Sequence, residues 1–221
     1  MKAAPLPHNE TERLKALEEL ELMDTLPEKV YDEITALASE ICGTPVSFLT
    51  LIDERRQWFK SKYGSDANET PREQAFCAHA ILNPDDVFIV QDARYDERFF
   101  DNPLTSSEPP VVFYAGVPVK DANNNAVGAL CVIDSRPRDL SEQKIESLKT
   151  LGKLVNVHFE LRQRKIELNK IHTRFKDATE KVKAIHEIVE TLVKSDKSLD
   201  QATHINALQE TIKSLKSLLQ P

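Results

Sequence analysis

Two apolar stretches decide the fold of this chain: VVFYAGVPV at residues 111–119 and AVGALCVID at residues 126–134. Both are rich in β-branched residues, and the DANNN segment between them consists mainly of residues that favour turns. They therefore predict two antiparallel strands joined by a turn. Apolar residues fall on both faces of each strand, so a sheet built from them needs cover on both faces. We expect an α/β domain in which helices lie against an antiparallel sheet.

Helix signals precede the first expected strand. A helix is predicted at 9–22, where Asn9 can cap the first turn with Glu12 reaching back to it. A second helix is predicted at 26–43, ending at Gly43. The further expected elements, in chain order, are strands at 45–53 and 57–62, a helical segment at 76–82, a strand at 87–91 and a long loop at 92–110.

The C-terminal part of the chain has a helical repeat. Between Ser141 and Lys194 there is no proline, and apolar residues recur at alternating steps of three and four from Leu154 to Leu199, with Arg164 and Asp196 as the exceptions. This is the heptad spacing of a helix that pairs with another helix, and such a helix would be on the order of 80 Å long. The segment SDKSLD at 195–200 offers a new helix start, so a helical hairpin is expected. The apolar positions, called the seam from here on, are Leu154, Val157, Leu161, Leu168, Ile171, Phe175, Ala178, Val182, Ile185, Val189, Leu192 and Leu199.

The distribution of charge divides the chain near residue 160. Acidic side chains outnumber basic ones in residues 1–160, and the reverse holds in residues 161–221. We therefore expect a folded domain at 1–160 and a coiled-coil helix with a helical hairpin at 161–221. The formal net charge of −7 argues against nucleic acid or an anionic membrane as a partner.

Cysteine content and hydropathy bear on the compartment. Cys42, Cys77 and Cys131 are an odd number of cysteines in apolar segments, which favours reduced thiols over a disulfide framework. The first ten residues lack the apolar core of a secretory signal. The longest mainly apolar run, residues 111–119, is much shorter than the roughly 18 residues of a membrane span. We expect a cytoplasmic protein.

Five segments together resemble the GAF domain family of sensory and signalling modules: PVSFLTLIDERRQWFKS (45–61), ETPREQAFCAHAIL (69–82), DNPL (101–104), VVFYAGVPV (111–119) and VGALCVIDSRPRDLSEQ (127–143). The resemblance extends from about residue 10 to residue 161. It implies a central antiparallel sheet of about six strands, helices behind it, and a small-molecule pocket on the other face under residues 71–110. It also implies that the first and last helices pair with a second copy and pass a signal to an output module. Too few residues follow the seam for a kinase or cyclase domain, so the output is expected in a separate protein, such as a kinase or response regulator.

The resemblance places a candidate pocket between the strands and the segments that cover them. An alternative is that the domain's own aromatic rings fill this space and the domain only dimerises. The expected lining mixes apolar walls with a few polar groups, as a small-molecule site would. The candidates are Phe76, Cys77, His79, Asp92, Arg94, Phe99, Phe113, Tyr114 and Val132.

Three features suggest specific chemistry, and each has a plainer interpretation. Bilin-binding relatives anchor their chromophore on a cysteine followed directly by histidine, whereas Cys77 and His79 are two residues apart. As metal ligands on a helix these two side chains would point about 200° apart, so no metal is expected and Cys77 is interpreted as a packing residue. Free methionine-R-sulfoxide reductases use pocket cysteines on this fold, but the cysteine spacing here does not resemble theirs.

The last feature is His186 followed by Glu187, which resembles the phosphoacceptor helix of histidine kinases. The arginine and proline usual after that pair are absent, so an exposed helix face is the favoured interpretation. We therefore expect a homodimeric, non-enzymatic sensor with no identified cofactor. The alternatives are a phosphotransfer protein with His186 as acceptor and a thiol-dependent sulfoxide reductase.

Overall fold

The computed structural model describes residues 1–194 and 198–219 of the chain. It divides into two compact units, residues 1–163 and residues 164–221. The long helix α4 (Glu142–Lys194) begins in the first unit and continues into the second. Among the described residues, no helix combines the length and the hydropathy needed to cross a membrane.

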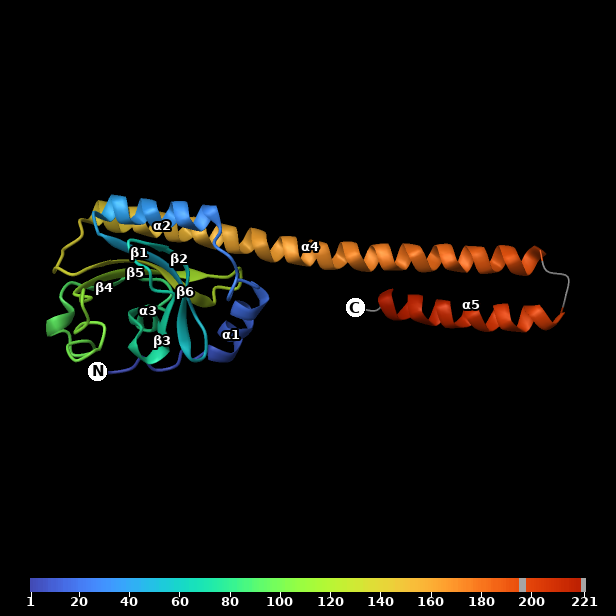
Figure 1. The fold of residues 1–221 in the computed structure, drawn as a ribbon, viewed down its shortest axis with the longest axis horizontal. Helices are drawn as coiled ribbons and strands as arrows, with labels where there is room; N and C mark the ends of the chain where they lie inside the picture. The colour runs from blue at the N-terminus through green and yellow to red at the C-terminus, as the bar shows by residue number, and fades with distance from the viewer. Residues whose placement is uncertain (195–197, 220–221) are drawn as a thin grey trace. The chain divides into compact units, whose positions relative to one another are not determined.

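The first unit is built on a six-stranded, wholly antiparallel sheet (Figure 1). Its strand order is β3-β2-β1-β6-β5-β4, so the apolar strands β1 and β6 lie at the centre. The predicted hairpin is the β5–β6 pair, in which Val117 lies opposite Leu130. The strands are β1 (Val46–Ile52), β2 (Arg56–Tyr63), β3 (Glu69–Pro71), β4 (Phe88–Val90), β5 (Phe113–Lys120) and β6 (Ala126–Asp134). The predicted fold class is confirmed.

Helices α1 (Glu10–Glu19), α2 (Lys29–Cys42) and the first part of α4 cover one face of the sheet. Helix α2 ends as predicted at Gly43, whose φ of 69° is a left-handed conformation that glycine adopts without strain. The predicted cap of α1 is wrong. Asn9 makes no side-chain cap hydrogen bond, and its amide donates to Asn125 Oδ1 at 3.0 Å.

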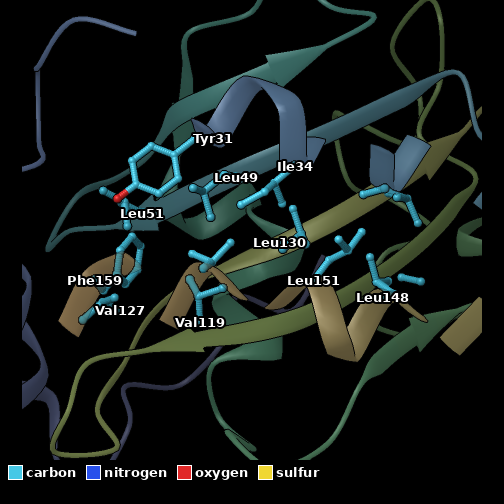
Figure 2. Close-up of a cluster of buried hydrophobic side chains, with 14 of the residues drawn as sticks. Tyr31, Ile34, Leu49, Leu51, Val119, Val127, Leu130, Leu148, Leu151 and Phe159 are labelled. Carbon is cyan, nitrogen blue, oxygen red and sulfur yellow. The ribbon is translucent and has the colours of Figure 1, made fainter. Parts of the chain in front are cut away.

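The main hydrophobic core lies between these helices and the sheet (Figure 2). Its residues alternate along β1 and β5, because successive side chains of a strand point to opposite faces. Tyr31 of α2 meets Phe159 of α4 edge to face, with ring centroids 6.0 Å apart. The buried side chains labelled in the figure are Tyr31, Ile34, Leu49, Leu51, Val119, Val127, Leu130, Leu148, Leu151 and Phe159.

The buried side chains of Arg13 and Lys60 link the N-terminal segments to the sheet by hydrogen bonds. The side chain of Lys60 on β2 is 0% exposed, and its Nζ donates to Thr25 Oγ1 and to the Leu26 carbonyl, each at 2.7 Å. It also lies 2.8 Å from Glu28 Oε1. Arg13 of α1 donates from Nη1 to the Ile52 carbonyl at 2.6 Å. Each buried charge is thus satisfied by hydrogen bonds, which is the condition for burying one without a large penalty.

The opposite face of the sheet carries α3 (Phe76–Ala80), two short 3₁₀ turns at Arg72–Gln74 and Ala93–Tyr95, and the loop that leads to β5. A second apolar cluster lies there, rich in aromatic rings. Phe76 and Phe99 stack with ring centroids 3.9 Å apart. The short strand β3 lies between the predicted strand at 57–62 and the predicted helical segment at 76–82, where the sequence analysis placed no element.

The second unit contains the later part of α4 and the helix α5 (Ser198–Leu219). Lys181 of α4 donates a hydrogen bond to Ser214 Oγ of α5. The predicted long helix and the second helix are confirmed. Residues 195–197 of the predicted turn, and the side chains of Leu192 and Leu199, lie outside the described part. Eight seam residues are exposed in the single chain: Leu154, Val157, Leu161, Leu168, Ile171, Phe175, Val182 and Val189.

Candidate functional site: a roofed cavity on the sheet

A cavity of about 450 Å³ lies in the first unit, on the sheet face opposite the main core. Strands β1, β2, β5 and β6 form its floor, and α3 with residues 104–111 forms its roof. A second hollow of about 620 Å³, beside α1 and the β1–β2 turn, has the charged side chains Glu18, Glu54 and Arg55 on its wall. We take the first as the candidate site because buried apolar side chains enclose it, as in small-molecule pockets.

Aromatic rings form two sides of the cavity. Phe48 of β1 and Phe59 of β2 stack with centroids 4.3 Å apart, and both contribute to the wall. On the other side, Phe76 of α3 lies 5.4 Å from the ring of Tyr114 on β5. The Phe76–Tyr114 distance lies in the range where aromatic rings attract one another, and Phe48 and Phe59 are slightly closer, so each ring at the wall packs against another ring.

One amide on the cavity wall has an oxygen that no described residue hydrogen-bonds. Gln57 lies two residues before Phe59 on β2, so both side chains point to the cavity face while Trp58 packs toward the main core. Gln57 Nε2 donates to Thr70 Oγ1 at 3.2 Å. Its Oε1 is buried and has no hydrogen-bond partner among the described residues.

Two thiols and a phenol also meet at the cavity wall. Cys77 Sγ of α3 and Cys131 Sγ of β6 lie 3.8 Å apart, and Tyr114 donates its hydroxyl to Cys77 Sγ at 3.1 Å. Gly116 makes this arrangement possible, because a Cβ there would lie 2.1 Å from the Tyr114 hydroxyl. The third cysteine, Cys42, is buried in the main core on the other side of the sheet.

Burial and hydrogen bonding act in opposite directions on these groups. Burial raises the pKa of Cys131 well above its usual range, and it does the same to the pKa of Tyr114. Burial also opposes ionisation of Cys77, but hydrogen bonds with Cys131, Thr50 and Tyr114 outweigh it and lower the pKa of Cys77. Of the two neighbouring thiols, Cys77 is therefore the one that ionises first.

The structure brings three of the predicted site residues to the cavity wall: Phe76, Cys77 and Tyr114. Phe99 stacks on the far side of Phe76 and supports it without lining the cavity. His79 lies beside Phe99, with centroids 4.9 Å apart, and its Nε2 is 3.1 Å from the Lys2 carbonyl. Burial lowers the pKa of His79.

Four other predicted residues lie elsewhere. Phe113 and Val132 point into the main core on the helix side of the sheet. Neighbouring strand residues face opposite sides, so Phe113 and Tyr114 could not both line one cavity. Asp92 and Arg94 pair with each other at the surface, with Arg94 Nη2 at 2.6 Å from Asp92 Oδ2, and neither borders the cavity.

The wall also contains residues that sequence reasoning missed, notably Gln57, Phe48, Phe59 and Cys131. The alternation of Gln57 with Phe59 in β2 was a usable signal, because both had to lie on one face. The approach of Cys131 to Cys77 was not readable, because it joins a strand to a helix 54 positions away in the sequence.

The candidate phosphoacceptor His186 lies on α4 in the second unit. Its Nε2 is 3.3 Å from Glu190 Oε1, one helical turn further on, and its side chain is exposed. Glu187, as the next residue, points about 100° away around the helix. Within the described part of the chain, no group of three or more histidine, cysteine or acidic side chains is arranged to hold a metal ion.

Six antiparallel strands, helices on one face and a roofed cavity on the other define the class of domain. The profile of the GAF domain family matches residues 26–159, which is more than half of the chain. The chain therefore belongs to the GAF domain family, as the five sequence segments indicated.

A curated relative and two solved structures show the same likeness. A cyclic di-GMP phosphodiesterase of Pseudomonas aeruginosa is 40% identical over 156 residues, which are 70% of this chain and 26% of the relative. The GAF domain of an Acinetobacter phosphoenolpyruvate-protein phosphotransferase aligns with a TM-score of 0.51 at 17% identity, over 74% of this chain and 97% of that one. A free methionine-R-sulfoxide reductase of Neisseria meningitidis aligns with a TM-score of 0.50 at 15% identity, over 75% of this chain and 99% of that one. The structural likenesses support the fold alone.

Proposed function

We propose that this chain is a cytoplasmic, non-enzymatic sensory module that binds a small molecule in the cavity and signals through paired helices. The observation that carries the proposal is the cavity of about 450 Å³, which lies within the size range of ligand pockets and has mainly apolar walls with a few polar groups. Membership of the GAF family supports a signalling role. The three free cysteines, all buried, fit a reducing compartment.

The seam on α4 supports pairing of two copies. Phe175 is 71% exposed and Leu168 is 65% exposed in the single chain. Large apolar side chains at heptad spacing gain free energy when a second helix covers them, and an identical helix offers the same spacing. A second copy of this chain is therefore the proposed occupant of the seam.

A separate output protein, such as a kinase or response regulator, would read the state of the paired helices. The ligand would act by binding one arrangement of the helices more tightly than another, and it could shift them only by that difference in affinity. The relative's phosphodiesterase activity is not transferred to this chain, because the alignment spans only 26% of the relative.

The proposal is tested by extracting small molecules from denatured protein that was purified from its native host, and adding them back to ligand-free protein. We expect slower amide exchange in α3, and a change in exchange in residues 164–191 of α4. In the variant Val46→Trp a large ring at the cavity wall should remove both effects, whereas Tyr95→Trp, at an exposed position, should keep them. If exchange is the same with and without the extract, the sensory proposal fails.

The proximity of Cys77 and Cys131 favours a second candidate, thiol-dependent reduction of a sulfoxide. Two thiols would give two electrons and two protons to the sulfoxide, whose S–O bond breaks to yield thioether and water while a Cys77–Cys131 disulfide forms. An added dithiol would return the pair to thiols. This candidate requires turnover that Cys77→Ser and Cys131→Ser each abolish and Cys42→Ser leaves intact. Absence of turnover in the unmodified protein would eliminate it.

A further inference from the structure

The cavity wall includes an acceptor that no described residue satisfies. Gln57 is 6% exposed, and its Nε2 is already committed to Thr70 Oγ1. With Nε2 as the end bonded to Thr70, Oε1 is the free end of the amide, and Oε1 has no partner among the described residues. A buried acceptor without a partner raises the free energy of the folded chain. A ligand that donates an N–H or O–H to this acceptor removes that cost, so it gains more binding free energy than it would by donating to a solvated acceptor.

The walls favour an aromatic ligand. The Phe48–Phe59 pair and the Phe76–Tyr114 pair contribute rings to two sides of the same cavity. Ring faces attract other rings in offset or edge-on arrangements, so a flat aromatic molecule finds partners on both sides. A cavity of about 450 Å³ would hold on the order of 15 non-hydrogen atoms, taking roughly 30 Å³ for each.

The walls disfavour an anion. No lysine, arginine or histidine is among the described residues that line the cavity. Its charged lining residue, Asp134, is an acid that is already paired with Arg138. Three lining residues, Pro45, Pro109 and Pro110, have no backbone N–H to offer. A phosphate or carboxylate would therefore enter without a countercharge and with few donors.

We propose that the cavity takes an uncharged aromatic molecule whose N–H or O–H donates to Gln57 Oε1. This inference rests on the proposed sensory function, because it names the ligand class of the same site. It excludes nucleotides and cyclic dinucleotides as occupants, although the curated relative acts on one of the latter as its name states.

Three probes that share a phenyl–naphthyl scaffold distinguish the possibilities; the first two have the same size. N-phenylnaphthylamine is neutral, carries one N–H and becomes fluorescent in apolar surroundings. Phenyl naphthyl ether replaces that N–H by an oxygen that only accepts. Anilinonaphthalene sulfonate keeps the N–H and adds a negative charge. The affinity of the full-length chain for the amine is measured by fluorescence, and the affinities for the other two by their displacement of it.

We expect the amine to bind about fivefold more tightly than the ether, as one net hydrogen bond would give, and more tightly than the sulfonate. Gln57→Leu should abolish the preference for the amine over the ether while leaving binding of the ether intact. Gln143→Leu, at an exposed position on α4, is the matched control and should keep the preference. Thermal unfolding of both variants checks that they are folded.

The results of the probe-binding experiment distinguish failure of the proposed ligand class from failure of the proposed sensory function. Binding without a preference for the amine, a preference that survives in Gln57→Leu, or tighter binding of the sulfonate would each overturn the ligand class and leave the sensory function standing. If no probe binds and no extracted molecule alters amide exchange, both the ligand class and the sensory function are overturned.

Discussion

Gly116 controls the position of the Tyr114 hydroxyl at the cavity wall. In Gly116→Ala the added Cβ would lie 2.1 Å from that hydroxyl and 2.7 Å from the ring carbon that bears it. Tyr114 is 1% exposed and has little room to move. We expect a loss of about 2 kcal/mol in the free energy of unfolding, as overpacking of a core gives, measured by urea denaturation. Tyr114→Phe in the same background should recover part of the loss, and unchanged stability of Gly116→Ala would contradict this account.

Glu10 pairs with Arg13 of its own helix and links α1 to the 3₁₀ turn Arg72–Gln74 through Arg72. Its carboxylate accepts from Arg13 Nε at 2.8 Å and Nη2 at 2.9 Å, and also from Arg72. Burial raises the pKa of Glu10, but these bonds and the two positive charges lower it to about 2. Because the pKa is lower in the folded chain, the ionised carboxylate stabilises the fold above about pH 4.5, and this contribution is lost as pH falls toward 2.

The pH dependence gives a measurable prediction. Glu10→Gln should lower the free energy of unfolding at pH 7 by on the order of 2 kcal/mol, and the gap from the unmodified chain should narrow at pH 3. Urea denaturation at the two pH values measures the gap. Glu12→Gln, on the exposed side of the same helix, is the control. A gap equal at both pH values would show that the ionised carboxylate is not the source.

His186 provides a test of the phosphotransfer alternative. Its neighbour in space is Glu190, at 3.3 Å, and the Glu187 of the sequence motif is directed elsewhere. We expect no acid-labile phosphate on the chain after incubation with histidine kinases of its host. Label that is lost in His186→Ala and kept in His172→Ala would contradict the non-enzymatic reading and favour phosphotransfer.

At the residue scale, sequence reasoning found Phe76, Cys77 and Tyr114 but misplaced Phe113 and Val132. Both of those residues are apolar and lie in strands that are apolar on both faces. The hydrophobic pattern of the sequence therefore could not show which face of each strand lines the cavity. Gln57 was missed although its alternation with Phe59 in β2 was a usable signal, because the strand pattern alone does not show that its amide is buried at a cavity.

At the scale of elements, the long helix α4 was predictable because it depends on local spacing and on the absence of proline. Helix α2 was predictable for similar reasons, with Gly43 as its end. Strand β3 was not, because its three residues gain their conformation by pairing with β2, where Gln57 lies opposite Thr70. The cavity also depends on contacts between segments that are distant in the sequence. The segments that form it could therefore be predicted, but most of the residues on its walls could not.

The seam makes a prediction at this scale. Leu168→Glu combined with Phe175→Glu would place charges where the second helix is proposed to pack, and we expect the dimer affinity to fall by about 100-fold or more. Both side chains are exposed in the single chain, so the fold of one copy should be kept. Sedimentation equilibrium measures the affinity. The control variant, Asn169→Glu with Thr173→Glu, adds the same charges outside the seam and should leave the dimer intact. Equal dimer affinities for the two double variants would exclude the seam as the dimer interface.

For the whole molecule, the proposal joins a cavity in one unit to a seam that runs into the other. Membership of the GAF family establishes the fold of the first unit. The exposed seam and the unsatisfied Gln57 acceptor, in contrast, are observed in this chain itself. Neither feature by itself makes a sensor. Together they predict that a bound molecule and a paired state occur in the same particle.

Native mass spectrometry of the chain purified from its own host tests this claim most directly. We predict a particle of two chains, each 25.1 kDa, that carries small neutral molecules released on mild activation. The Val46→Trp variant should give the same dimer without the added mass. A single chain without bound molecules, or a dimer whose adducts persist in Val46→Trp, would contradict the account.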